Sequence, residues 1–164
     1  TIIACEGRHP EKYHWLLEQC QVWGAKIYPV CANAHDQAMA MVQVMRHFST
    51  IVYGYHLMTE GADISQLVEM SSPIYRLELI MVGRLFAQDP ILYTDIIFSN
   101  EDNIAMMKRF AYRFLELLED VELGDKEAFM NMFQQVADWF GEYAEIFLHE
   151  SKAMLLKADE LKKH

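Results

Sequence analysis

The sequence predicts a mainly α-helical fold that is preceded by a short strand–helix–strand segment. After residue 33, apolar residues recur at helical spacing, and no proline follows Pro90. Before residue 32, two short apolar runs flank one amphipathic stretch. These patterns are typical of helices and of a βαβ unit respectively. We therefore expect the end of an α/β domain over residues 1–32 and an all-helical domain over residues 33–164.

The first 31 residues have the size and pattern of a βαβ unit. Thr1–Cys5 is short, apolar and β-branched, which is typical of a buried strand. Apolar residues follow at helical spacing over residues 11–23, and Gly24 is a favourable C-terminal stop. Lys26–Val30 predicts a second strand, and Pro29 places that strand at an edge because proline has no N–H to donate. Two strands and one helix cannot bury a sheet, so we expect this segment to end a larger domain.

The rest of the sequence predicts a succession of helices of uneven length. The first is apolar around its circumference and must therefore be covered on several sides. Helix boundaries are indicated by Asp63 as an N-cap, by Pro73 in a first turn, by the break at Asp89-Pro90, and by Gly124 as a stop. Asn33 is the expected N-cap of the first helix, with Asp36 in its first turn, and the apolar part of that helix covers residues 38–58. The other expected helices cover residues 64–70, 74–88, 91–98, 102–123 and 126–162.

Composition and charge exclude several classes of partner. The 14 basic and 24 acidic side chains give a net charge of −10, which argues against binding to nucleic acid or to an anionic membrane surface. The longest uncharged run, from His47 to Thr59, is too short to span a bilayer. The three cysteines, an odd number without metal-type pairing, favour a reducing cytosol over a disulfide framework. We therefore expect a cytoplasmic protein.

The motifs of several common chemistries are absent from the sequence. There is no GxSxG nucleophile motif, no P-loop and no GxGxxG phosphate loop. Glu11 and His14 have the ExxH spacing of helical di-iron sites, but the second match, Glu6 and His9, lies in an expected turn. We therefore expect neither a metal site nor a phosphate-binding loop in this chain.

Two arginines and one histidine are the candidate ligand-binding residues. Arg76 and Arg84 emerge from largely apolar faces of the expected helix 74–88, and a buried guanidinium needs an anionic partner. That partner is either a carboxylate of the chain, such as Glu78 or Asp89, or a ligand carboxylate held in a bidentate clamp. His47 lies within the apolar helix 38–58, where it either hydrogen-bonds a backbone carbonyl or donates to a ligand oxygen.

Short motifs distributed over nearly the whole chain, from about Cys5 to Leu161, resemble one known family. The motifs are His35-Asp36-Gln37, Arg46-His47-Phe48, residues 71–79, residues 82–90, Glu18-Gln19, residues 22–25 and residues 138–141. The most specific are SSPIYRLEL and VGRLFAQDP, at their spacing in this sequence. These motifs resemble those of the prephenate dehydrogenases, and in particular the bifunctional enzymes that are fused to chorismate mutase.

The resemblance implies an enzyme that oxidatively decarboxylates prephenate to 4-hydroxyphenylpyruvate in tyrosine biosynthesis. NAD would accept the hydride, and tyrosine would act as a feedback inhibitor. The resemblance also implies a homodimer that pairs through residues 33–164, with residues 1–32 closing the NAD-binding domain. The family's glycine-rich loop and catalytic histidine would then precede Thr1, as would a chorismate mutase domain. We therefore assign no catalytic residue to this chain and expect it to have neither dehydrogenase nor mutase activity alone.

The resemblance also assigns roles to single residues. Arg84, in the VGR motif, would hold a substrate carboxylate. His47, in the RHF motif, would contact the substrate and mediate inhibition by tyrosine. Tyr93 would correspond to an aromatic residue that reaches the site from the partner subunit, and Arg76 would have a structural or cross-subunit role. The alternative from the residues alone is a helical module that binds aromatic carboxylates, or only dimerises, without catalysis.

Overall fold

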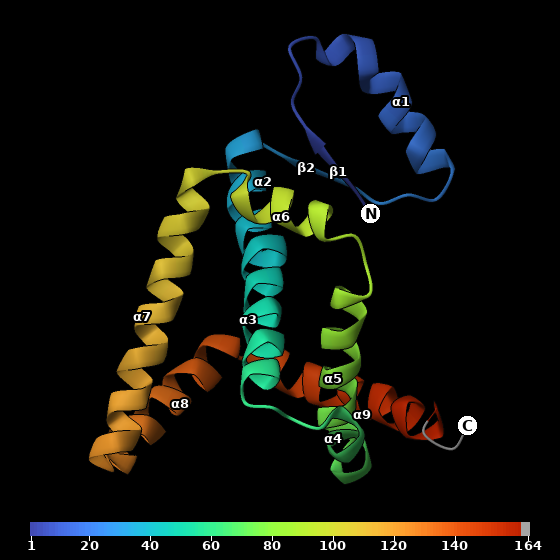
Figure 1. Ribbon diagram of the computed structural model, residues 1–164. Helices are drawn as coiled ribbons and strands as arrows, with labels where there is room; N and C mark the ends of the chain where they lie inside the picture. Colours follow the sequence, from blue (N-terminus) through green and yellow to red (C-terminus); the bar gives the residue numbers. More distant parts are fainter. Residues whose placement is uncertain (162–164) are drawn as a thin grey trace. The chain divides into compact units, whose positions relative to one another are not determined.

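The computed structural model describes residues 1–161 and is mainly α-helical, which confirms the expected fold class (Figure 1). The chain divides into two compact units, Thr1–Arg46 and His47–His164. This division falls inside the helical part of the chain, whereas the sequence pattern puts a domain boundary between residues 32 and 33. That boundary stays a prediction, and the two units are described separately.

The first unit contains the expected βαβ arrangement. Strand β1 (Ile2–Cys5) pairs in parallel with strand β2 (Ile27–Val30), and helix α1 (Pro10–Val22) connects them and packs on β2. Pro29 pairs opposite Ala4. The expected burial of the first strand is wrong. The side chains at positions 2 and 3 are 38% and 44% exposed, because two strands and one helix leave most of the sheet surface uncovered.

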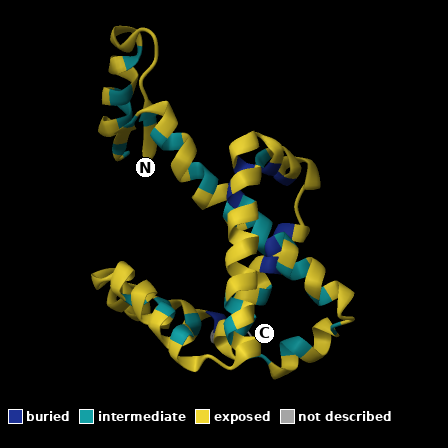
Figure 2. Cartoon of the chain, turned by 90° about the vertical axis from the view of Figure 1, so that its left-hand side faces the viewer, coloured by how far each residue is buried: buried dark blue, intermediate teal, exposed yellow. Residues whose placement is uncertain are grey.

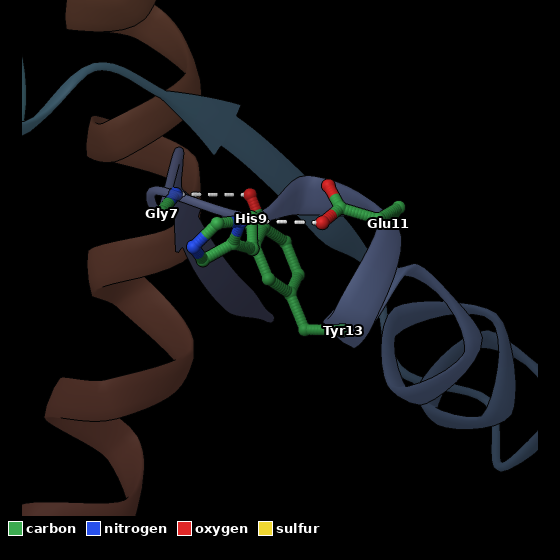
Figure 3. A network of polar contacts seen from close by, with 4 residues as sticks. All are labelled: Gly7, His9, Glu11 and Tyr13. Carbon is green, nitrogen blue, oxygen red and sulfur yellow. Dashed lines mark hydrogen bonds and ion pairs between the residues drawn. The ribbon is translucent and has the colours of Figure 1, made fainter.

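The turn between β1 and α1 is held by polar contacts within the same segment (Figure 3). The backbone N–H of Gly7 donates to the hydroxyl of Tyr13 over 3.0 Å, and Nδ1 of His9 lies 3.2 Å from Oε1 of Glu11. A Cβ at position 7 would lie only 3.1 Å from the Tyr13 ring, so a glycine suits this close approach. These contacts fix the entry of the chain into α1.

A continuous helical segment follows β2. It consists of α2 (Ala32–Met39), the π-helical segment η1 (Ala40–Met45) and α3 (Arg46–Thr59). The helix expected to cover residues 38–58 is confirmed, although residues 40–45 are π-helical rather than α-helical. Such segments are rare and occur mostly as local insertions in α-helices. The N-cap expected at Asn33 is wrong, because α2 already begins at Ala32 and Cys31 is its N-cap.

Capping side chains begin the next helices, and the N-cap expected at Asp63 is confirmed. Asp63 accepts hydrogen bonds from the N–H groups of Ser65 and Gln66 at the start of α4, and Ser72 caps α5 in front of Pro73. Asp89, Asn100 and Asp125 cap the three helices that follow in the same way. The helices are α4 (Ile64–Met70), α5 (Pro73–Phe86), α6 (Pro90–Phe98), α7 (Glu101–Leu123), α8 (Lys126–Phe140) and α9 (Glu142–Leu161).

The single helix expected over residues 126–162 is wrong. Gly141 separates α8 from α9 with φ 52° and ψ −133°, a conformation that residues with a Cβ rarely adopt. The chain changes direction there, and α9 packs against both α8 and α5. The expected helix end at Lys162 lies outside the described residues.

The core of the described chain is small, and much apolar surface remains exposed (Figure 2). Large hydrophobic side chains such as Trp139 and Phe98 are 79% and 77% exposed. Apolar surface of this extent marks regions that contact another protein or a ligand. Within residues 1–161, no helix has both the length and the apolar character needed to cross a membrane. The buried residues are Val44, Thr50, Val82, Leu85, Tyr93, Ile97, Asn103, Met106 and Ala158.

Helices α3 and α5 approach most closely at Gly54. A Cβ built at this position would overlap the ring of Phe86 and would lie 3.2 Å from Cγ1 of Val82. By contrast, a Cβ at Gly83 on α5 would meet nothing within 4 Å. The absence of a side chain at position 54 therefore sets the separation of the two helices.

We predict that Gly54→Ala destabilises the protein and that Gly83→Ala does not. Alanine stabilises an exposed helix by roughly 0.5–1 kcal/mol relative to glycine, and this gain applies to both variants. Only Gly54→Ala adds overpacking, which costs about 1–3 kcal/mol. Urea unfolding of both variants measures the difference. A second substitution, Phe86→Leu, should recover part of the loss, and equal stability of the two glycine variants would contradict the close approach.

Candidate functional site

Helix α5 fixes the position of Arg84. The helix is anchored by Val82 and Leu85, which are buried, while the intervening Arg84 is exposed. At the end of α5, the side-chain amide of Gln88 donates to the backbone carbonyl of Arg84 over 3.0 Å. The backbone at Arg84 is thus held while its guanidinium remains accessible to a ligand.

The internal ion pair that could have explained Arg84 does not form. Oδ1 of Asp89 accepts the backbone N–H of Ile91 over 2.9 Å and so caps α6. In the described part of the chain, no ion pair joins a carboxylate to Arg84. Its guanidinium therefore keeps all its donors for a carboxylate from outside the chain.

Arg76 has different surroundings, although it lies on the same helix. Its side chain is half-buried, and its Nε is buried without a hydrogen-bond partner among residues 1–161. An unsatisfied buried donor costs about 1–3 kcal/mol, more when the group is charged. Arg76 is therefore less accessible to a small ligand than Arg84.

The structure brings together two of the expected site residues, His47 and Tyr93. Their ring centroids are 4.8 Å apart at an interplanar angle of 69°, an edge-to-face arrangement. His47 lies in the first turn of α3 and is half-buried, whereas Tyr93 lies on α6 and is buried. The contact fixes the imidazole ring against a neighbouring helix of the same chain.

A pair of tyrosines that sequence reasoning missed connects α3 and α5. The hydroxyl of Tyr53 donates to that of Tyr75 over 3.2 Å. This hydrogen bond raises the pKa of Tyr53 to about 12, and burial and the nearby charges of Tyr75 and Glu78 act in the same direction. The two residues are 22 positions apart on different helices, so no local motif could have indicated the pair.

A cavity of about 410 Å³ lies between α3 and α5. Val82, Gly83 and Phe86 of α5 line it together with Gly54 of α3. Its volume falls within the range of small-molecule sites, and its wall is mostly apolar. Arg84, His47 and Tyr93 do not line this cavity, and at 100° per residue Arg84 projects from the side of α5 away from Val82 and Phe86. The cavity and the guanidinium of Arg84 are therefore separate features of α5.

The described residues do not form a metal site or a dinucleotide phosphate site. Within residues 1–161, no group of three histidine, cysteine or acidic side chains could hold a metal ion. His14 instead lies 3.8 Å from Glu18. The turn before α1 has a single glycine, and α1 begins at Pro10, which has no N–H to offer a phosphate. This turn therefore does not form a binding site for the phosphates of NAD.

Comparison with known proteins gives one family and several relatives. Residues 31–135 match the family described as the prephenate dehydrogenase dimerization domain. Two proteins named T-protein, from Enterobacter agglomerans and Haemophilus influenzae, are 53% and 48% identical over 160 and 162 residues. A probable arogenate/prephenate dehydrogenase from Methanocaldococcus jannaschii is 32% identical over 141 residues.

The relatives are longer than this chain. The alignments cover 98% and 99% of the chain but 43% of each T-protein, so the chain spans less than half of their length. For the Methanocaldococcus jannaschii protein, the coverage is 85% of the chain and 32% of the relative. The segment of this chain that matches the family includes His47, Arg84 and Tyr93.

We predict that Tyr75→Phe removes a pH-dependent contribution to stability. The pKa of Tyr53 is raised from 10.0 to about 12 in the folded state. The contribution of its hydrogen bond to the free energy of unfolding is therefore complete below pH 10 and is lost as the pH rises to 12. The stability difference between wild type and Tyr75→Phe should therefore be largest below pH 10 and shrink above it. Urea unfolding across this range measures the effect. Tyr55→Phe, an exposed position on the same helix, is the control, and a difference that grows with pH would contradict the assignment.

Proposed function

Because this chain belongs to the family of prephenate dehydrogenase dimerization domains, we propose that it pairs two subunits of a prephenate dehydrogenase and binds the substrate there. The observation that carries the proposal is the family match over residues 31–135, which includes Arg84, His47 and Tyr93. The two T-proteins, which are about half identical to this chain, support the same assignment.

The proposed reaction is the oxidative decarboxylation of prephenate to 4-hydroxyphenylpyruvate in tyrosine biosynthesis. NAD would supply the hydride acceptor, and the described residues of this chain would not hold its phosphates. The substrate carries two carboxylates, and loss of carbon dioxide makes its ring aromatic, so positioning is the main demand on the protein. In the proposal the parent enzyme is cytoplasmic, inhibited by tyrosine and fused to chorismate mutase, and its catalytic base and cofactor loop lie outside this chain.

Arg84 is the proposed clamp for a substrate carboxylate. Its guanidinium is exposed and has no ion pair among the described residues. A planar guanidinium binds a carboxylate through two parallel hydrogen bonds, which sets orientation as well as affinity. This charge would hold one end of the substrate.

His47 is the proposed contact for both substrate and inhibitor. The edge-to-face contact with Tyr93 holds the imidazole against α6, and the proposed contact is a hydrogen bond between this ring and a ligand oxygen. Tyr93 supports His47 from within the same chain, and its proposed role includes contact with the ligand. Arg76, whose Nε is buried without a partner, is the proposed structural or cross-subunit arginine.

We predict that Arg84→Gln, in the intact enzyme, raises the KM for prephenate by about ten- to a hundredfold while changing kcat much less. The carboxylate is charged in both the ground state and the transition state, so the clamp stabilises both nearly equally. A charge-assisted contact of this kind contributes about 1.5–3 kcal/mol. Steady-state kinetics measures the split between KM and kcat.

Arg84→Lys and a thermal melt are the controls for this prediction. Lysine keeps the charge but loses the planar fork, so it should restore affinity only in part. The melting temperature of Arg84→Gln should stay near that of the wild type, because the residue is exposed and forms no ion pair in the described chain. A collapsed melting temperature with an unchanged KM would show a structural role instead.

We predict that His47→Ala, in the intact enzyme, weakens inhibition by tyrosine more than it weakens turnover. Loss of one hydrogen bond to the inhibitor costs roughly 0.5–1.5 kcal/mol. Inhibition constants and kcat for the variant measure both effects. His56→Ala, an exposed histidine near the other end of α3, is the matched control and should change neither. If the two variants behave alike, His47 has no specific role in inhibition.

A further inference from the structure

An apolar groove between α3 and α7 is not used by the proposed substrate site. It has a volume of about 430 Å³, and its wall is almost wholly apolar. Phe48 and Val52 line one side, and Phe110, Phe114 and Leu115 line the other. A carboxylate or other polar metabolite would find almost no hydrogen-bonding group in this wall, so apolar protein side chains fit the groove better.

The apolar side of α7 extends beyond the groove. Phe114, Leu115 and Leu118 are 66%, 58% and 43% exposed, and they follow one another at helical spacing. A contiguous exposed patch of this kind is typical of an interface with another protein. The edge of this patch carries Lys108 and Glu122, which are both exposed.

The charges on α7 are separated along its length. Its middle holds the basic residues Lys108, Arg109 and Arg113, whereas residues 114–123 hold four acidic residues and no basic one. Lys108 lies seven residues before Leu115, and Glu122 lies seven residues after it. Since seven residues make nearly two turns, all three lie on the same side of the helix. Along this side, the chain therefore passes from the basic Lys108 through the apolar residues around Leu115 to the acidic Glu122.

We propose that the groove receives the same side of α7 from a second copy of the chain, antiparallel to the first. The two-fold axis passes beside Leu115. Such an axis places Lys108 of each copy opposite Glu122 of the other, and it seats Phe114 and Leu115 of each copy at the groove of the other. A parallel arrangement would instead set Lys108 against Lys108 and Glu122 against Glu122, which repel. We call this antiparallel contact between the two α7 helices the seam. It rests on the pairing of subunits proposed above and specifies where that pairing occurs.

Charge reversal tests the seam. Lys108→Glu and Glu122→Lys should each raise the dimer dissociation constant of the purified chain by about tenfold or more, because each creates two like-charge pairs across the axis. The double variant should return toward the wild-type value, since it restores both pairs. Arg109→Glu is the matched control, because this neighbour lies about 120° around the helix from Leu115. Sedimentation equilibrium measures all four variants.

A cysteine placed at the axis gives an independent test. In a background where Cys5, Cys20 and Cys31 are replaced by serine, Leu115→Cys should form a disulfide-linked dimer on mild oxidation, because only a position at a two-fold axis meets its own copy. Leu123→Cys is the control. Its two copies would lie about 24 Å apart along the helices, and it should remain unlinked.

The outcomes separate the seam from the pairing itself. If the wild-type chain dimerises but neither charge reversal weakens it and Leu115→Cys does not cross-link, the seam is wrong and the proposed pairing stands. If the wild-type chain is a monomer at micromolar concentration, both the seam and the proposed pairing are wrong. Loss of affinity in both single variants, with recovery in the double variant, supports the antiparallel arrangement.

Discussion

The need to cover α3 on several sides determines the arrangement of residues 47–161. This helix is apolar around much of its circumference, and isolated it would expose more hydrophobic surface than water favours. Helix α5 approaches it at Gly54, where no side chain intervenes, and the hydrogen bond between Tyr53 and Tyr75 holds the same pair of helices. Helix α6 covers its first turn through the contact of Tyr93 with His47, and α7 shares an apolar groove with it. The candidate ligand-binding residues thus lie on α3 or on helices that pack against it.

Arg76 and Arg84 lie on the same helix but differ in burial, and this difference supports different proposed roles. Both belong to α5, yet Arg84 is exposed, whereas Arg76 is half-buried with an unsatisfied Nε among the described residues. An accessible guanidinium with no ion pair can bind and release a charged ligand. A half-buried one is better suited to a lasting contact, because desolvation makes its pairing costly to break. The proposed division between a substrate clamp and a structural or cross-subunit residue follows from this difference.

Local chemistry made much of the fold predictable from sequence. Asp63, Ser72-Pro73 and Gly124 mark helix ends because their side chains or backbone freedom act within one turn, and the structure confirms these ends. The break at Gly141 was missed because one glycine inside a long helical pattern does not show which dihedral angles it will adopt. The contacts between Tyr53 and Tyr75 and between His47 and Tyr93 were not predictable, since they depend on how separate helices pack. Arg84 and His47 were candidates from their positions in apolar helices, whereas Tyr93 was identified only through the resemblance to a known family.

The proposed function depends most on a carboxylate of prephenate bound by Arg84. A crystal structure of the intact enzyme with bound prephenate tests this contact most directly. We expect a ligand carboxylate on Arg84 with two N–H···O contacts of about 2.7–2.9 Å. A structure in which both carboxylates of prephenate bind other residues, while Arg84 remains in solvent, would contradict it.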